Sequence, residues 1–372
     1  MNHNSVICEL IAANENWRDI LAEKKIRLKE EGSLMICNYL PGADFFDPAV
    51  QEARGIIIDL EELTPVCWPF RKFGNWQEPY ADEIDWGSAR VQQKLDGSIM
   101  KLWWDKRKNE WQWSTNSVIR AEEAQNNNGV LFSSLIKSAC DYQDIIRAEE
   151  DFLKKDCTYI FELVSPLNQI VVRYPVTRLF HIGTRNNVTG REMDVDIRVI
   201  KPYEYDLGSL AQIEEFGNHL NDGSDYPSVE GFVVVDKNWN RVKVKTRMYL
   251  DFHHRINNGN ISKQAVLEDI LEGRTANEIL ERYPQGRRIV MYYLWQFEEM
   301  LDGIDKAVHY ARALYEEFSH ERKAVAMSLL RGKDVRYNAF AFAGLENQKT
   351  AMQLVRESGV RQIIKLIPDY PA

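Results

Sequence analysis

Lys94-Leu95-Asp96-Gly97-Ser98 is the stretch around which the chain is organised. It lies between Val91–Gln93 and Ile99–Trp104, where apolar and polar residues alternate. This alternation predicts two strands joined at a turn. Asp96-Gly97 is typical of a turn, because glycine tolerates positive φ and aspartate hydrogen-bonds its own backbone. On this stretch alone, a surface hairpin with a solvated lysine is as good an interpretation as a functional site.

The composition is that of an ordinary globular protein, with 372 residues, a formal net charge of −9 and 44% hydrophobic residues. This length predicts two domains with substantial cores. Met1–Leu10 lacks a signal-peptide pattern, and no apolar run approaches the roughly eighteen residues of a membrane span, so we expect a cytoplasmic protein without membrane contact. The acidic balance argues weakly against nucleic acid, but it leaves room for a local basic groove.

The cysteines are odd in number and scattered, and the chain contains no Cys-x-x-Cys pair. This pattern predicts reduced thiols and no zinc site. The five cysteines are Cys8, Cys37, Cys67, Cys140 and Cys157.

Periodicity divides the chain into a mixed part and a helical part, with the boundary between Met248 and Ile261. The expected domains are therefore residues 1–250 and residues 251–372. In the first, the spacing predicts an amphipathic helix near Asn16–Glu31 and helical structure over Ser133–Lys155. The expected strands are Leu34–Tyr39, Ile56–Ile58, Ile99–Trp104 paired with Trp111–Thr115, Thr158–Pro166, Val171–Tyr174, Arg178–Thr184, Val229–Asp236 and Arg241–Thr246. The expected helices of the second domain are Gln264–Leu271 with Ser262 as its cap, Ala276–Tyr283, Arg287–Phe318 as one or two helices, and at least one more after Leu345.

Basic residues occur at two places in the sequence that are suited to binding an anion. Arg54-Gly55 precedes the buried strand Ile56–Ile58, where a guanidinium fork and a closely approaching backbone suit a phosphate. Lys72 lies in Pro69–Trp76, a loop that mixes cations with aromatic residues. A rim arginine and a basic turn shielded by aromatic rings are the alternative interpretations.

Two carboxylates and three cations belong to apolar strands. Glu162 interrupts Thr158–Pro166, and Glu230 stands at the mouth of the next apolar run. Buried acids are rare unless they are paired or functional. Arg241, Lys243 and Lys245 alternate with apolar residues and so share one face of a strand. The alternatives are a Glu162 that points to water and an edge strand with a lysine-rich solvent face.

In this order, the elements resemble the five collinear motifs of the covalent nucleotidyltransferases across residues 37–250. The chain is most similar to the bacteriophage-type RNA ligase 1 family, the tRNA-repair ligases. Three features carry the narrower resemblance: the Glu-Ala-Arg-Gly-Ile element at Glu52–Ile56, the Arg-Lys-Phe-Gly-Asn loop at Arg71–Asn75, and a helical tail in place of a β-barrel. The resemblance implies an α+β fold, in which an adenylation domain of antiparallel sheets with flanking helices precedes an all-α domain.

The resemblance also implies an ATP-dependent RNA ligase. Lys94 would attack the α-phosphate of ATP and hold AMP as a phosphoramidate, which requires that burial or neighbouring cations lower its pKa. AMP would pass to an RNA 5′-phosphate and a 3′-hydroxyl would displace it. The implied cofactors are ATP and Mg²⁺, with Mn²⁺ as an alternative, and the implied partner is RNA with such ends, including nicked tRNA. The oligomeric state is not indicated.

Further roles follow from the same resemblance. Asp96 and Gly97 would belong to the AMP site, Glu162 would hold the ribose and Glu230 would bind the metal ion. The remaining site residues are Arg54 and Lys72 for phosphates, Lys243 and Lys245 for the α-phosphate and pyrophosphate, and Asn38, Tyr39 and Tyr249 as weaker matches.

Two departures from the family pattern stand out. Ser114-Thr115-Asn116-Ser117 lacks the lysine of a Ser-Lys-Gly-Ser-like element, and Cys37 replaces a tyrosine before Asn38-Tyr39. The rival functions are a DNA ligase or capping enzyme, disfavoured by the absent barrel, and a non-catalytic binder of nucleic-acid ends. Two basic clusters in residues 251–372 suit either a solvated helix face or RNA. They are Arg282, Arg287 and Arg288, and Arg322, Lys323, Arg331, Lys333 and Arg336.

Overall fold

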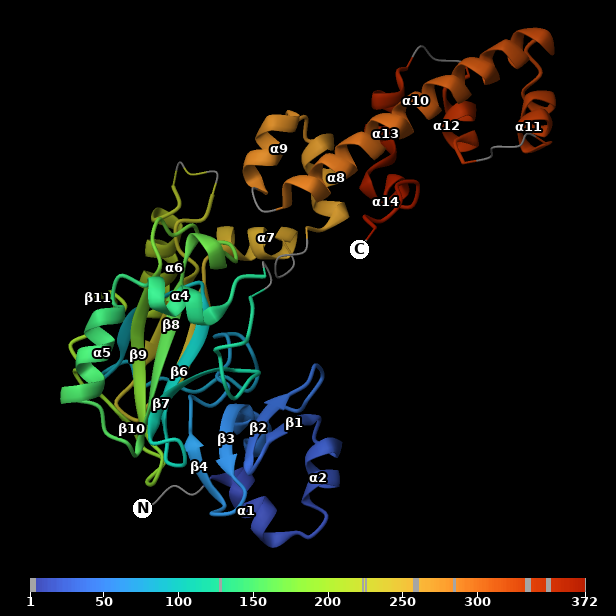
Figure 1. The fold of residues 1–372 in the computed structure, drawn as a ribbon. Helices are drawn as coiled ribbons and strands as arrows, with labels where there is room; N and C mark the ends of the chain where they lie inside the picture. Colours follow the sequence, from blue (N-terminus) through green and yellow to red (C-terminus); the bar gives the residue numbers. More distant parts are fainter. Residues whose placement is uncertain are drawn as a thin grey trace. The chain divides into compact units, whose positions relative to one another are not determined.

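The computed structural model describes residues 5–126, 129–222, 224, 226–256, 261–283, 286–331, 336–345 and 349–371. Lys333 of the second basic cluster lies outside these residues. The chain divides into two compact units, Met1–Leu250 and Asp251–Ala372 (Figure 1).

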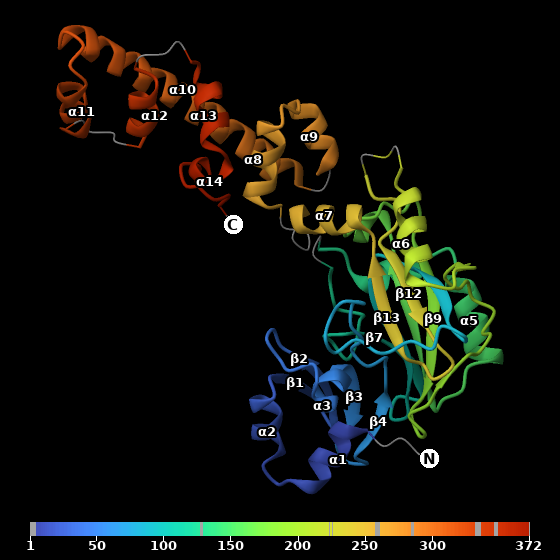
Figure 2. The same cartoon turned by 180° about the vertical axis from the view of Figure 1, so that it is seen from behind.

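The first unit begins with an antiparallel sheet in the order β1-β2-β3-β4, covered by helices from the same segment (Figure 2). The helix predicted over Asn16–Glu31 is wrong in its second half: β1 pairs with β2, and Lys25 turns the chain with a φ of 58°. The strand predicted at Leu34–Tyr39 is confirmed. The elements are α1 (Val6–Ala13), α2 (Trp17–Glu23), β1 (Ile26–Glu31), β2 (Leu34–Tyr39), α3 (Pro48–Glu52), β3 (Arg54–Asp59) and β4 (Thr64–Cys67).

A five-stranded antiparallel sheet in the order β10-β9-β8-β6-β7 forms the middle of the unit. The predicted pairing of Ile99–Trp104 with Trp111–Thr115 is confirmed. The strand predicted at Val171–Tyr174 is wrong, because this segment is a loop whose backbone binds Asp96. The elements are β6 (Ser98–Asp105), β7 (Glu110–Thr115), α4 (Phe132–Ser138), α5 (Tyr142–Asp151), β8 (Cys157–Val164), the 3-10 turn Pro166–Asn168, β9 (Arg178–Asn186) and β10 (Glu192–Met193).

A third antiparallel sheet has the order β11-β5-β12-β13. The strands on either side of Asp96-Gly97 do not form a hairpin, because β5 belongs to this sheet and β6 to the five-stranded one. The turn after Lys94 therefore carries the chain from one sheet to the other. The elements are β5 (Arg90–Lys94), β11 (Glu204–Tyr205), α6 (Leu210–His219), β12 (Gly231–Val235) and β13 (Arg241–Lys245).

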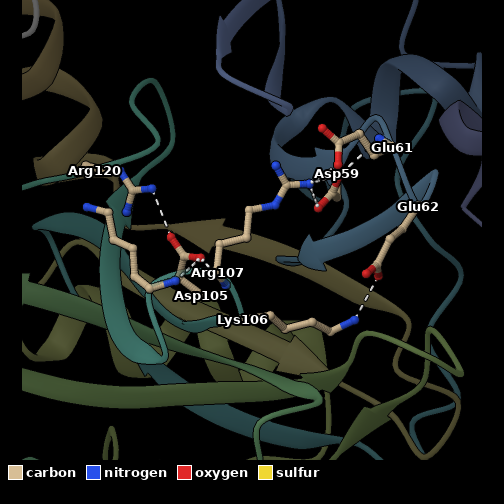
Figure 3. A network of polar contacts seen from close by, with 8 residues as sticks. Asp59, Glu61, Glu62, Asp105, Lys106, Arg107 and Arg120 are labelled. Carbon is tan, nitrogen blue, oxygen red and sulfur yellow. Dashed lines mark hydrogen bonds and ion pairs between the residues drawn. The ribbon is translucent and has the colours of Figure 1, made fainter.

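A group of ion pairs joins the first sheet to the β6–β7 hairpin (Figure 3). The Arg107 guanidinium lies 2.8 Å from a carboxylate oxygen of Asp59 and 2.9 Å from Glu61. Lys106 pairs with Glu62 at 2.8 Å. These contacts fix the N-terminal segment against the strand that begins at the Lys94 turn. Figure 3 also labels Asp105 and Arg120, which pair at 2.9 Å.

In the second unit, the described secondary structure is entirely helical. Ser262 caps α8 by accepting a hydrogen bond from the Ala265 N–H, as the sequence predicts. The apolar face of one long helix, α10, supplies much of the core, including Phe297 and Ile304. The elements are α7 (Arg247–Ile256), which crosses the boundary, α8 (Lys263–Leu271), α9 (Ala276–Arg282), α10 (Arg287–Glu317), α11 (Arg322–Arg331), α12 (Asn338–Ala343), α13 (Ala351–Ser358) and α14 (Val360–Ile363).

The predicted α+β class, with antiparallel sheets followed by helices, is confirmed. Among the described residues, no helix is both long and apolar enough to span a bilayer.

Candidate active site

Lys94 is the last residue of β5, and strand register decides what surrounds it. Gly231 of β12 pairs with Lys94 on one side and with Lys245 of β13 on the other. Glu230, the residue before Gly231, is only 3% exposed. Its two carboxylate oxygens lie 2.6 Å from the Lys94 Nζ and 3.0 Å from the Lys245 Nζ. The buried acid is thus held between the two lysines.

This triad sets the charge state of Lys94. Burial favours the neutral amine, but Glu230 and Glu162 outweigh it and raise the pKa of Lys94. Burial opposes ionisation of Glu230, yet Lys94 and Lys245 hold its pKa below the ordinary value. The expectation of a lowered Lys94 pKa is therefore wrong for this state, because carboxylates rather than cations are its nearest charged neighbours.

Asp96 organises the turn that follows Lys94. Its carboxylate accepts hydrogen bonds from the Tyr249 hydroxyl and from the Val171 and Val172 N–H groups, each at 2.7 Å. Its own N–H donates to the Tyr174 hydroxyl at 2.9 Å. At 2% exposure Asp96 has little access to a ligand. Asp96 therefore shapes the site. Tyr249 supports it through the carboxylate and Tyr174 through the backbone N–H.

Position 97 requires glycine because the turn passes very close to the backbone of β8. A Cβ on this residue would lie 2.2 Å from the Leu163 carbonyl oxygen, although Gly97 has no positive φ. The absent side chain lets the turn pass against β8. The Gly97 N–H consequently donates to Glu162 of that strand at 3.2 Å.

Glu162 lies half-buried in β8, directly opposite Ile99 of β6. Burial raises its pKa to about 7; Lys94 and Arg54 lower it, and Glu230 raises it. At neutral pH this carboxyl exchanges its proton readily. It can accept a hydrogen bond from a hydroxyl group in either protonation state.

Three cations of the first unit lie close to aromatic rings. The Arg54 guanidinium and the Lys243 Nζ lie 5.4 Å and 5.2 Å from the centre of the Phe73 ring. The Lys72 Nζ lies 5.0 Å from the Phe45 ring. Burial lowers the pKa of all three. Repulsion from Arg54 adds to this effect for Lys72 and Lys243, whereas Tyr39 and Glu162 oppose it for Arg54. For Lys243 the pKa falls to about 6, with Lys72 the largest repelling neighbour.

Arg54, Lys72 and Lys243 form a cation cluster. Like charges within it repel one another, and a bound anion would reduce this repulsion. The alternative of a lysine-rich solvent face on β13 is wrong, because Lys243 and Lys245 are half-buried and Arg241 is buried. Arg241 nevertheless does not join the cluster as a free cation. It pairs with Glu192 at 2.5 Å and lies 4.2 Å from the Phe70 ring.

Two of the weaker matches, Asn38 and Tyr39, occupy β2, the strand beside Arg54. Asn38 pairs with Arg54 across β2 and β3. The Tyr39 ring lies 5.9 Å from the Lys72 Nζ, and Tyr39 also favours the charged form of Arg54. Cys37 is fully buried in the core of the first sheet, so its departure from the family pattern affects packing.

Sequence reasoning missed three contributors. Tyr174 and Phe73 carry no pattern that distinguishes them from other aromatic residues. Lys101 does have a signal, because it shares a strand face with Trp103 and therefore should be buried. Asn116 belongs to the element that lacks the family's lysine. Its buried Oδ1 atom has no hydrogen-bond partner in the described part of the chain.

The side chains near Lys94 offer few ligands for a metal ion. No group of three or more His, Cys, Asp or Glu side chains that could hold a metal ion occurs among the residues that the structure describes. Mg²⁺ in nucleotide sites typically takes one or two carboxylates together with phosphate oxygens and water. Glu230, held in its ionised form, fits such a shared role.

A family model described as RNA ligase, of the phage T4 RNA ligase 1 type, matches residues 52–249. That match covers more than half of the chain and includes Arg54, Lys94, Glu162, Glu230 and Tyr249. The chain belongs to the RNA ligase family.

Individual relatives are distant. The chain is 26% identical over 306 residues to a protein of Autographa californica nuclear polyhedrosis virus that is named as a bifunctional polynucleotide kinase/RNA ligase, covering 76% of this chain and 42% of that protein. It is 24% identical over 225 residues to RNA ligase 1 of bacteriophage TS2126, covering 57% of this chain and 54% of that one. The chain thus spans about half the length of these curated relatives.

Among solved structures, an archaeal ATP-dependent RNA ligase has a TM-score of 0.47 at 12% identity, covering 82% of each chain. Family membership rests on the sequence match, since this score is below the value that would establish a shared fold.

Proposed function

We propose that the protein is an ATP-dependent RNA ligase that works through a Lys94–AMP intermediate. The observation that carries this proposal is the Lys94–Glu230–Lys245 triad, together with the cations Arg54, Lys72 and Lys243 on neighbouring elements. Lys94 is held at the end of a strand by register, so its amine has one defined position. An in-line attack on phosphorus requires such positioning more than it requires covalent chemistry from the protein.

In the first step, the Lys94 nitrogen attacks the α-phosphorus of ATP. A P–N bond forms, the bond to the bridging oxygen breaks, and pyrophosphate leaves. The attacking amine must be neutral, so Lys94 must first leave Glu230 and lose its proton to water. Lys245 favours this loss by repulsion, and together with Arg54 and Lys72 it stabilises the charge that develops on the phosphates. Bound phosphates would also favour the charged form of Lys243, which would then add to this stabilisation.

Glu230 would be the protein ligand of a divalent ion, which when bound neutralises phosphate charge. Glu162 would accept a hydrogen bond from a ribose hydroxyl. Asp96 and Gly97 contribute before any substrate binds, because they fix the turn that follows Lys94. Magnesium is the expected ion, and manganese can fill the same role.

Two further steps complete the proposed reaction. An oxygen of the RNA 5′-phosphate attacks the phosphorus of Lys94–AMP, and the lysine amine leaves. A 3′-hydroxyl then attacks the RNA 5′-phosphorus, which forms the phosphodiester bond and releases AMP. Each displacement takes place at phosphorus, so the same cations serve all three steps.

RNA recognition is proposed for the second unit. It contains a cavity of about 970 Å³ lined by Tyr310, Tyr337 and three cations, Lys306, Arg336 and Lys365. Aromatic rings beside cations suit unpaired bases and their phosphates, as in the broken loop of a nicked tRNA. Of the first basic cluster, Arg282 is committed elsewhere, because it faces Asp269 at 3.7 Å and the Phe252 ring at 5.1 Å.

Incubation with ATP and magnesium tests the core of the proposal. We expect a mass increase of one AMP on Lys94, reversed by pyrophosphate and absent from Lys94→Ala. Lys106→Ala, which removes an exposed lysine of the turn between β6 and β7, is the matched control and should be adenylated normally. A non-catalytic binder would form no adduct. Joining of nicked tRNA, linear RNA and nicked DNA in parallel would distinguish an RNA ligase from a DNA ligase.

A second comparison tests the role of the helical unit. Replacing Lys306, Arg336 and Lys365 together by serine should leave Lys94 adenylation intact and reduce tRNA joining. Replacing the exposed Arg287 and Arg288 provides the control. Equal joining by both variants would contradict a role for this cavity.

A further inference from the structure

Lys101 lies in the middle of β6, and its side chain has no exposed surface. Its Nζ donates a hydrogen bond of 2.5 Å to the Gly55 carbonyl oxygen. The charged and titratable groups that act on it are Arg54 and Cys67, and neither is a carboxylate. A buried ammonium without a counter-ion is costly, and a lysine that served only packing would be replaced by an apolar residue without loss.

Strand register places Lys101 on the face that carries the proposed nucleotide site. Ile99 pairs with Glu162 and Lys101 pairs with Ile160 across β6 and β8. Residues two apart in a strand share a face, so Lys101 lies about 7 Å along the sheet from the level of Glu162.

The hydrogen bond to Gly55 connects Lys101 with Arg54. Gly55 has a φ of 85°, and a Cβ on it would lie 2.5 Å from the Lys101 Nζ and 2.8 Å from the Asn116 Cα. The Gly55 backbone therefore lies in close contact with both Lys101 and Asn116. Because Arg54 precedes Gly55, the position of its guanidinium depends on these contacts.

Asn116 stands where the element that resembles Ser-Lys-Gly-Ser lacks its lysine. It follows β7, which pairs with β6 so that Ser114 lies opposite Lys101. The positive charge absent from the end of β7 is thus present on the neighbouring strand, facing the same glycine.

We propose that Lys101 is a positioning residue for nucleotide phosphates, which holds Arg54 through the Gly55 carbonyl and adds a buried positive charge beside it. This inference rests on the proposed function, since it assumes that ATP phosphates bind at Arg54. A bound phosphate would provide the counter-charge that Lys101 lacks in the free protein.

The charge on Lys101 depends on pH. Burial, helped by Arg54 of β3, lowers the pKa of Lys101 to about 8, and Cys67 of β4 opposes this shift. Burial raises the pKa of the Cys67 thiol. The facing groups of β7 and β8, Ser114 and Ile160, do not titrate. Lys101 is consequently charged below about pH 8. The KM for ATP should rise as the pH increases through that value.

The experiment measures Lys94 adenylation by the full chain as a function of ATP concentration and pH. In Lys101→Met we expect the KM for ATP to rise about tenfold, which equals about 1.4 kcal/mol, with a smaller change in maximal rate. The rise of KM near pH 8 should disappear. The melting temperature should stay within a few degrees of wild type. Lys106→Met, which removes an exposed lysine of the same hairpin, should match wild type in all three measurements.

A double variant, Lys101→Met with Asn116→Lys, separates charge from packing. Recovery of ATP affinity supports the proposal, because a lysine on the other strand restores only the charge. If Lys101→Met lowers the melting temperature and Asn116→Lys rescues nothing, Lys101 is a structural residue and the proposal is overturned. If the wild type forms no Lys94 adduct, the proposed function fails and this inference fails with it. If it forms the adduct while Lys101→Met keeps the wild-type KM and pH profile, this inference alone fails.

Discussion

Glu230→Gln is the substitution that most directly tests how the proposed site is held together. The carboxylate is 3% exposed and compensates both Lys94 and Lys245. Glutamine keeps the shape and one acceptor oxygen but removes the charge, so two half-buried lysines then face each other without a counter-ion. Removing one partner of a buried ion pair costs roughly 3–5 kcal/mol.

The lysine side chains retain 19% and 20% exposure, so solvent screens part of the repulsion. We therefore expect the lower end of that range, about 3 kcal/mol. In a unit of about 250 residues, each kcal/mol shifts the melting temperature by about 2–4 °C. The variant should thus melt about 6–12 °C below wild type. Adenylation of Lys94 should fall at least about 100-fold, because the proposed metal ligand is lost as well.

Thermal unfolding at pH 7 and mass spectrometry of the Lys94 adduct measure the two effects. Glu204→Gln is the matched control, since this carboxylate lies on the same sheet but is 48% exposed, and its pair with Arg90 is 3.6 Å long. It should shift the melting temperature by less than about 2 °C. A Glu230→Gln protein that melts and adenylates like wild type would refute the assignment of Glu230 as the central counter-ion.

Three further predictions concern the turn and its neighbours. Tyr249→Phe removes a 2.7 Å donor to the buried Asp96 carboxylate and should cost about 1–3 kcal/mol in urea unfolding; no loss would mean that the turn does not depend on this bond. Glu162→Gln should be increasingly more stable than wild type as pH rises from about 5 to 8, because a folded-state pKa raised to about 7 makes ionisation of Glu162 destabilising over that window; parallel stability curves would contradict the raised pKa. Gly97→Ala should unfold the turn or abolish adenylation, since its Cβ would meet the Leu163 carbonyl at 2.2 Å, whereas Gly208→Ala, with its nearest atom at 3.8 Å, should be active.

Local patterns in the sequence were sufficient for several elements. A short apolar run identified β2. Alternation identified the β6–β7 pairing and the common face of Lys243 and Lys245, because a strand places every second residue on one side. The Ser262 cap and the long helix after Arg287 followed from turn and periodicity signals that extend over a few residues. The helix predicted through Glu31 failed, because strand pairing with β2 overrode a local amphipathic pattern.

The sequence by itself determined which residues could carry phosphate chemistry: the Lys94 turn, two acids within apolar strands, and cations at strand ends. Tertiary structure decided how they are coupled. Glu230 reaches Lys94 across 136 positions and Tyr249 reaches Asp96 across 153. Sheet register creates the first contact, and α7, the helix that follows β13, brings Tyr249 to Asp96. Nothing near Lys94 in the chain specifies either arrangement. The pKa of Lys94 rises rather than falls because desolvation competes with carboxylates supplied by distant strands, and that balance exists only once the strands are paired.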